Sequence, residues 1–340
     1  VPAFVAKSHS QLLANPTAPR TPNPAYLRNW LTTPMLDDGL GADALAGDDI
    51  FTATIPAEDY ANRTLLRYRI AVSDSDGSSV TAPFLDDDSL NFACFIYDGI
   101  PDYVTTTRTY PAEPILNTLP AYHLLTTQAD YDECVAYDAN QIPRNSYDAR
   151  SAFNWSGTFV YNGIAYDNIS YRLRQRNARY SNRGKRSFRF RFNRGNHVQF
   201  HDMWGNPYPT RWRTLNSHKM HARGGTNFGL YEAANGILWN TTGTPSPFTH
   251  WFHFRVIKNS EEAPDQYHGD FYGFLLAMED YDRRFLKAHD LEEGNLYKLK
   301  SGLTEGLDVI RYHAPRGTRG GADYENIIFN LRPQQNDAWL

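Results

Sequence analysis

The chain has 340 residues, of which 41% are hydrophobic, 14% aromatic and 21% charged. This length predicts two domains, because a single hydrophobic core stops growing at about 250–300 residues. The net charge of −4 is too small to predict a nucleic-acid partner, and no apolar run is long enough to predict a membrane span. The aromatic content favours β-structure, since aromatic side chains pack well on pleated sheets.

The segment before residue 101 is predicted to form β-strands. Apolar and polar side chains alternate in residues 48–57 and 65–77, and the second run turns at Asp76-Gly77. Such amphipathic strands are typical of an immunoglobulin-like or fibronectin-like β-sandwich, here over residues 1–100 and incomplete at its start. The acidic stretch at 74–77 lacks the other ligands of a calcium loop, so we interpret it as a β-turn.

Residues 101–118 are rich in Thr, Pro and Tyr, and we interpret them as a linker to a second domain at 119–340. The patterns in this domain predict helices at 127–129, 227–240 and 282–291. They predict strands at 122–125, 158–173 (a hairpin turning at Asn162-Gly163), 185–192, 248–257, 269–280 and 294–301. The fold class expected from this order is α+β, with antiparallel strands around one main helix.

A basic segment from Arg172 to Arg194 contains ten Arg or Lys residues. Alternation places one set of side chains on the strand face opposite the phenylalanines of 188–192: Lys185, Ser187, Arg189 and Arg191. This face would bind an anion such as phosphate if it lines a cleft, and would otherwise be a solvated surface. The sequence leaves both alternatives open.

The histidines and cysteines give weaker signals. Three pairs of histidines occur at 197/201, 218/221 and 250/253, but without the helix and intervening glutamate of a common zinc motif. We therefore expect loop and core histidines rather than a metal site. Cys94 and Cys134 either form one disulfide or remain free thiols.

Two later motifs are more specific: "GDFYGFLLAMEDYDRRFL" at 269–286 and "GNLYK" at 294–298. Together with "LPAYHLL" at 119–125 and "KRSFRFRF" at 185–192, they resemble the spore-coat CotH kinase family of secreted or surface proteins. The resemblance covers residues 119–340. It implies a protein-kinase-like lobe, an antiparallel sheet around one main helix, with the C-terminal lobe largely absent from this chain. An immunoglobulin-like module ahead of such a domain is familiar in bacterial members.

The resemblance also implies roles for individual residues. A protein kinase moves the γ-phosphoryl group of ATP, held with Mg2+, to a protein substrate. Lys185 would contact phosphate, Glu232 would orient this lysine, and Glu279 would lie near the adenine. Lys298 would contact phosphate or pair with Glu279 or Asp282. No Trp/Phe-Asp-x-Asp motif follows Lys298, so no catalytic residue is assigned, and the aspartates that bind the metal are expected outside this chain.

The alternative is a non-catalytic surface, adhesion or coat protein. It would bind a glycan or a protein partner through an aromatic-rich loop from Trp204 to Trp212, together with Trp239 and Trp251. Either function predicts an extracellular or cell-surface location. We interpret Asp280 and Asp282 as the start of the helix that follows them rather than as metal ligands.

Overall fold

The computed structural model describes residues 14, 21, 23–28, 30–56, 60–84, 86–136, 154–174, 185–219, 229–262, 270–299 and 309–313. For 298–299 and 309–313 the description is limited to the backbone. The chain divides into two compact units, one of residues 1–196, 217–220 and 251–276, and one of residues 197–216, 221–250 and 277–340. Within the described ranges, no helix has the length and apolar character needed to cross a membrane.

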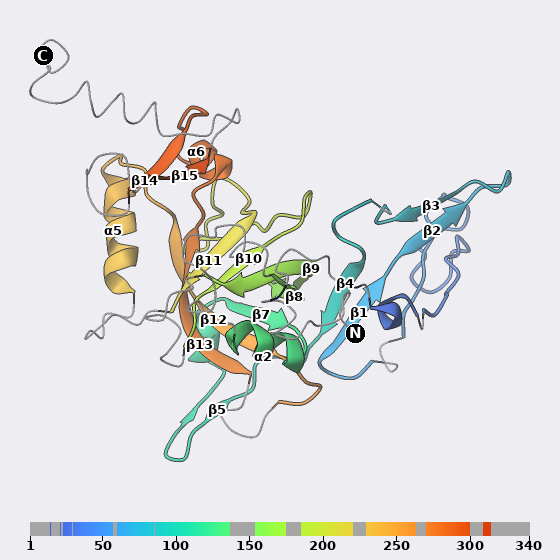
Figure 1. The fold of residues 1–340 in the computed structure, drawn as a ribbon. Coiled ribbons are helices and arrows are strands. Elements are labelled where there is room, and N and C mark those ends of the chain that lie inside the picture. The colour runs from blue at the N-terminus through green and yellow to red at the C-terminus, as the bar shows by residue number, and fades with distance from the viewer. Residues whose placement is uncertain are drawn as a thin grey trace, which may run out of the picture. The chain divides into compact units, whose positions relative to one another are not determined.

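Seven strands close into a barrel in the order β10-β11-β13-β12-β7-β8-β9 (Figure 1). They are β7 (Ala121–Leu125), β8 (Trp155–Tyr161), β9 (Ile164–Leu173), β10 (Phe188–Arg191), β11 (Thr214–His218), β12 (Thr249–Ile257) and β13 (Phe271–Glu279). β7 pairs in parallel with β12 and antiparallel with β8, so the barrel is mixed. Closure leaves no strand edge unpaired.

The β8–β9 hairpin confirms the turn predicted at Asn162-Gly163. Both residues have positive φ angles, 51° and 74°, as the tight two-residue turn between twisted strands requires. Tyr161 and Ile164 are register partners immediately before and after it.

Aromatic side chains fill the barrel. Phe188 and Phe190 of β10 are fully buried, and their ring centroids lie 5.5 Å and 5.7 Å from that of Phe254 on β12. Tyr122 of β7 stacks on Phe252 at 4.4 Å. The three phenylalanines of 188–192 are all buried and form a core face. Offset and edge-to-face ring contacts of this kind add stability beyond the apolar area that they bury.

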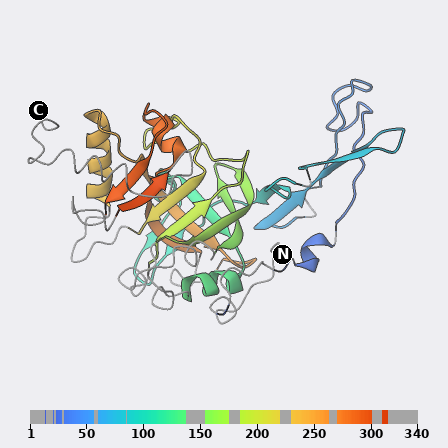
Figure 2. The ribbon, with the colours of Figure 1, turned by 45° about the horizontal axis from the view of Figure 1, so that its top comes forward.

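The described helices are short: α2 (Gln128–Ala136), α5 (Leu230–Thr241) and α6 (Arg283–Ala288), with 3-10 turns η1 (Pro24–Leu27) and η3 (Leu116–Thr118). α2 lies beside β8 and β9 (Figure 2), where Trp155 Nε1 donates a 2.8 Å hydrogen bond to Glu133. α5 buries only its small residues Ala233 and Gly236. Its larger apolar side chains are exposed, including Leu238 at 60%.

The predicted fold class is therefore wrong. The described residues form a mostly β structure with a closed mixed barrel, not a partial immunoglobulin-like sandwich followed by a kinase-like lobe around a main helix. The sheet buries its aromatic face against itself by closing, so it needs no central helix. The apolar spacing of 227–240 correctly predicted a helix, but the exposed side chains of α5 show that this helix does not form the centre of a core.

Before the barrel, the described strands form three small antiparallel pairs: β1 (Thr64–Tyr68) with β4 (Phe92–Ile96), β2 (Ile70–Ser73) with β3 (Ser79–Ala82), and β5 (Tyr103–Val104) with β6 (Thr109–Tyr110). The run predicted as one strand at 65–77 is thus divided between two sheets. The strand predicted at 48–57 is wrong, since Thr52 forms only an isolated bridge with Leu36. The division at 101–118 into two domains stays a prediction.

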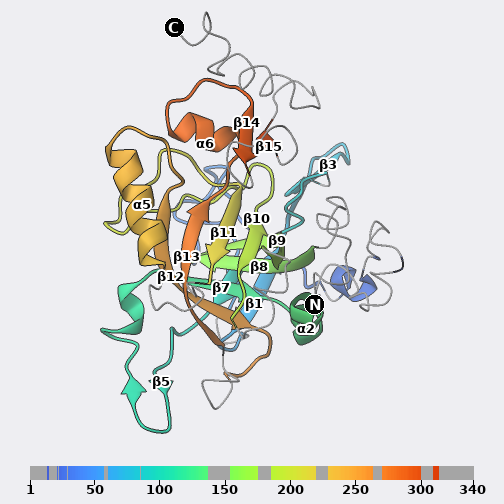
Figure 3. The same ribbon diagram turned by 60° about the vertical axis from the view of Figure 1, so that its left-hand side comes forward.

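Within the first compact unit, β1 and β4 pack against the barrel strands. Leu65, Ala93 and Phe95 cover a buried apolar cluster of Leu125, Val160, Ala165 and Ile257. In the second unit, β14 (Leu296–Leu299) pairs with β15 (Val309–His313), close to α6 in Figure 3. An ion pair of 2.9 Å between Arg283 and Glu293 links α6 to the segment that leads into β14.

Candidate functional site

Lys185 precedes β10, and its Nζ donates a hydrogen bond to the carbonyl oxygen of Phe274 on β13. The neighbouring residue on β13 is Gly273, whose φ of 126° disfavours any side chain. A Cβ atom at Gly273 would lie 2.9 Å from Lys185 Nζ. The glycine therefore leaves the space that the lysine head group occupies.

Among the described residues, no carboxylate is within ion-pair distance of the ammonium group of Lys185. Burial lowers the pKa of this group from 10.5 to about 8. A half-buried ammonium group without a counter-ion is less stable in its charged form than in water. An anion that reaches this nitrogen would remove that penalty.

The backbone around Lys185 is held in place by β13 and its neighbours. The hydroxyl of Tyr272 accepts a hydrogen bond from the backbone N–H of Arg186 and donates one of 3.2 Å to its carbonyl oxygen. The next residue, Ser187, is buried, and its Oγ accepts from the N–H of Lys219 at 3.1 Å. These bonds fix the position from which the lysine side chain extends.

Glu232, the predicted partner of Lys185, lies in the first turn of α5. Its Oε2 is buried and has no hydrogen-bond partner in the part of the chain that the structure describes. Glu232 belongs to the second compact unit and Lys185 to the first. Their pairing stays a prediction.

Glu279 ends β13 and is 4% exposed. Its Oε2 accepts hydrogen bonds from His289 Nε2 at 3.1 Å and from the N–H of Phe248 at 3.2 Å. The imidazole of His289 stacks on Phe248 with 4.5 Å between centroids. Burial raises the pKa of Glu279 above its ordinary value, although the bond to His289 acts in the opposite direction. These contacts show a structural role, and the predicted position near adenine stays a prediction.

The remaining residues of the motif are placed as follows. Asp282 caps α6 by accepting from the N–H groups of Arg284 at 2.7 Å and Phe285 at 3.4 Å, so its predicted role at a helix start is confirmed. Asp280 does not cap the helix and instead accepts from Asn216 at 2.9 Å. Lys298 lies in β14, and its side chain is outside the described residues.

The structure also settles the state of the cysteines. Cys94 is exposed and Cys134 is buried, and they form no disulfide with each other. In the aromatic-rich loop, Trp212 is 2% exposed and belongs to a core. Trp204 is 70% exposed, at the tip of a turn in which Asp202 accepts from its N–H at 2.9 Å.

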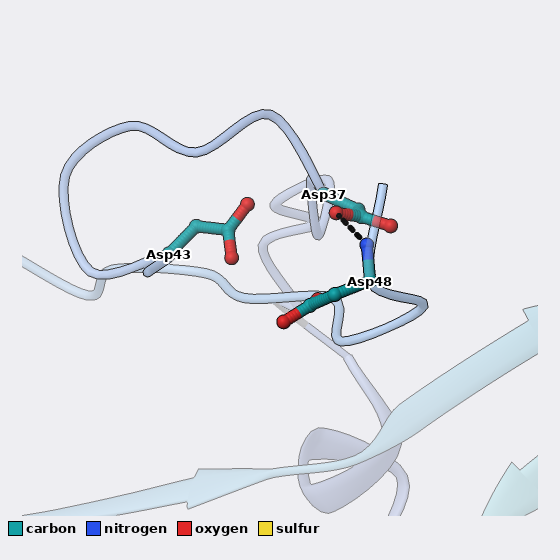
Figure 4. A group of neighbouring side chains, drawn as sticks. All are labelled: Asp37, Asp43 and Asp48. Carbon is teal, nitrogen blue, oxygen red and sulfur yellow. Dashed lines mark hydrogen bonds between the residues drawn. The ribbon is translucent and has the colours of Figure 1, made fainter. Parts of the chain in front are cut away.

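A group of carboxylates that the sequence analysis did not select lies between the bridge residues Leu36 and Thr52. Three carboxylate oxygens, one from each of Asp37, Asp43 and Asp48, lie within 4.8 Å of one another (Figure 4). Asp37 accepts from the N–H of Gly47 at 2.5 Å and from the N–H groups of 48 and 49. These bonds explain the arrangement as loop folding. The glycine-rich acidic sequence of 37–49 was the signal that could have identified it.

Two candidate site residues have strong electrostatic features. Lys185 is a half-buried cation with no carboxylate partner among the described residues, and Glu279 is a buried carboxylate bonded to a histidine. Of these two residues, only Lys185 can donate a further hydrogen bond to a small anion. Comparison with known proteins found no family model and no curated protein that matches this chain.

Proposed function

We propose that this chain binds the phosphate groups of a nucleotide through Lys185. The observation that carries the proposal is a half-buried ammonium group beside Gly273 that has no carboxylate partner among the described residues. A carboxylate in hydrogen-bond range would neutralise the lysine permanently and compete with a ligand. Without one, a phosphate oxygen is the group that best restores the stability of the charged form.

The proposal extends to the activity implied by the motifs at 269–286 and 294–298. On that view the chain is the nucleotide-binding portion of an extracellular CotH-like protein kinase, which uses ATP with Mg2+ and modifies a protein. Phosphoryl transfer depends mostly on positioning and on neutralising charge, and a lysine at the phosphates serves both. Lys185 is the only residue to which the proposal assigns a contact.

A second candidate function rests on Trp204. An indole group that is 70% exposed at the tip of a rigid turn offers a flat apolar surface to a sugar ring or a protein partner. In this reading the protein is a non-catalytic surface or coat protein. Substitution of Trp204 by Ala would then remove binding to that partner and leave nucleotide binding unaffected.

The test of the main proposal is the melting temperature of the protein with and without Mg-ATP. We expect Mg-ATP to raise it, because a ligand that binds only the folded state stabilises that state. Lys185→Met removes the charge but keeps the length of the apolar stem. In the absence of ligand, this variant should melt at a higher temperature than the wild type, because it lacks the half-buried charge of Lys185. Mg-ATP should not shift its melting temperature.

Lys287→Met is the matched control, because Lys287 is exposed on α6. It should leave both melting temperatures within about 1 °C of the wild type, as surface substitutions usually do. A wild-type shift that persists in Lys185→Met would contradict the proposal. A lower melting temperature of the ligand-free variant would show instead that the lysine is there for stability.

A further inference from the structure

A basic face forms where the backbone of 197–199 meets that of 211–213. Val198 and Trp212 exchange two backbone hydrogen bonds, of 3.1 Å and 2.8 Å, and both are buried. Val198 and Trp212 form an isolated antiparallel bridge, and His197, Arg211 and Arg213 are the residues directly beside this pair in the two segments. We use the name basic face for the surface around these three residues.

α6 adds a further guanidinium group to the same face. Arg284 Nη2 lies 3.4 Å from His197 Nδ1 and 3.5 Å from its Nε2. Its Nη1 lies 3.4 Å from the carboxylate of Asp282, and both of these side chains are partly exposed, at 32% and 26%. Asp282 is also engaged as the cap of α6, so its charge is shared with the backbone.

The charges around His197 act together on its ring. Burial, followed by the positive charges of Arg284, Arg213 and Arg211, lowers the pKa of His197, whereas the negative charge of Asp282 raises it. The imidazole is therefore neutral at pH 7, and the face carries more positive than negative charge. These residues all belong to the second compact unit.

We propose that Arg211, Arg213, Arg284 and His197 form a binding site for a phosphoryl group that carries two negative charges. Guanidinium groups present paired donors that match the oxygens of a phosphoryl group. A bound dianion favours the protonated form of His197, and the protonated imidazole then supplies a further hydrogen-bond donor. Inorganic phosphate, a nucleotide and a phosphorylated side chain share this chemistry. The site does not include Lys185, and the proposal does not depend on the proposed nucleotide binding.

The experiment is a titration of the full chain with inorganic phosphate, observed through the imidazole proton resonances of His197 and by calorimetry. Phosphate should raise the pKa of His197, and an equal ionic strength of chloride should not. Arg213→Gln and Arg284→Gln should each weaken phosphate binding at least tenfold, or by about 1.4 kcal/mol, because each removes a charge-assisted hydrogen bond. If Arg284→Gln does not fold, Arg284→Lys is used in its place, because lysine keeps the positive charge at this position.

Arg283→Gln is the matched control, because it removes the same charge from the same helix but its side chain is 71% exposed and pairs with Glu293. This variant should bind phosphate within about twofold of the wild type. An unchanged titration of His197, or equal losses in Arg213→Gln and Arg283→Gln, would overturn the proposal.

Separate titrations with ATP and with a phosphoserine peptide identify the source of the phosphoryl group. A ligand that binds more tightly than inorganic phosphate and loses affinity in Arg213→Gln is supported as that source. Binding that survives in Arg213→Gln but disappears in Lys185→Met would place the anion at Lys185 and would also overturn the proposal.

Discussion

The guanidinium group of Arg67 forms two hydrogen bonds with the carboxylate of Asp167, at 2.7 Å from Nε and 2.9 Å from Nη2. Arg67 lies on β1 and Asp167 on β9, so this pair connects the first strands of the chain to the barrel. Thr158 donates a further bond of 2.6 Å to the same carboxylate. Burial raises the pKa of Asp167, but the bonds from Arg67 outweigh it and hold the pKa below the ordinary value.

Replacement of Arg67 by Met should destabilise the protein by about 3–5 kcal/mol, because the carboxylate of Asp167 would remain buried without its counter-ion. Urea unfolding at pH 7 measures this change. Arg108→Met, at an exposed site beside Tyr110, is the control and should change the unfolding free energy by less than about 0.5 kcal/mol. Equal effects of the two variants would contradict the interpretation of the pair.

Arg67→Met should also change how the stability of the protein depends on pH. The folded-state pKa of Asp167 is depressed, so its contribution to stability is present above the unfolded value, about 3.9, and is lost as pH falls through the folded pKa. Arg67→Met should raise that pKa and reverse the sign of the contribution. Its stability deficit should therefore be largest at neutral pH and shrink towards pH 4.

Two buried histidines on adjacent barrel strands predict a loss of stability in acid. No ring nitrogen of His123 or His253 makes a well-formed hydrogen bond within the described part of the chain, although the backbone of Val160 and of Leu116 acts to raise their pKa values in part. Burial, followed by the charge of Arg255, lowers both pKa values to about 3. The stability due to the neutral rings is complete above about pH 6.5, the unfolded value, and is lost as pH falls towards 3.

The expected slope is about 1.4 kcal/mol per pH unit for each histidine. Asp270, whose pKa burial raises to about 6, acts in the opposite direction and offsets part of it below pH 6. His123→Phe should remove about one third of the histidine contribution, because burial also lowers the pKa of His250 to about 3. The ring of His123 lies among Phe95 and Tyr97, so this site should tolerate an apolar replacement. Urea unfolding between pH 5 and pH 7.5 tests this, and an unchanged slope in His123→Phe would disprove it.

Gly273→Ala should reduce both stability and the proposed binding of Mg-ATP. The φ of 126° disfavours a side chain, and the new Cβ would displace the head group of Lys185. Backbone strain of this kind costs about 1–3 kcal/mol. Gly163→Ala is the control, because its φ of 74° is also positive but the space around it is open. Gly163→Ala should lose stability and keep the melting shift with Mg-ATP, and a lost shift in both variants would show a general effect of destabilisation.

The cysteines should differ in reactivity. Cys94 is exposed and Cys134 buried, so a thiol reagent should modify one cysteine in the folded protein and both in urea. Burial raises the pKa of the Cys94 thiol, which should make its reaction slower than that of an unfolded cysteine. Modification of neither thiol before unfolding would contradict the exposure of Cys94.

The sequence predicted the local features of this fold well and the nonlocal ones poorly. The turn at Asn162-Gly163 and the core face of Phe188 and Phe190 depend on neighbouring residues, so alternation and turn chemistry were sufficient. The parallel pairing of β7 with β12 has no local signal, and without it an open sheet around a helix looked equally reasonable. The apolar spacing of α5 is the same whether a helix is covered or exposed.

The candidate site shows the same limit. Lys185 was chosen from its motif, but alternation could not distinguish a solvated lysine from one buried beside Gly273. The bond of Glu279 to His289 depends on how β13 is followed by α6, which no spacing rule predicts. Asp282, by contrast, was correctly placed because a helix cap is determined by the residues directly after it.

Closure of the barrel has a consequence for how the protein is made. β7 can pair with β12 only after β12 is synthesised, because the register partner of Ala121 is His253. β1 likewise has to wait for β9, which carries the Asp167 carboxylate that Arg67 binds. Until then the aromatic face of the first strands is exposed to water, and strand edges are open to other chains. The nascent polypeptide thus passes through a long period of vulnerability to aggregation, and slowing translation before residue 253 should lower the yield of soluble protein.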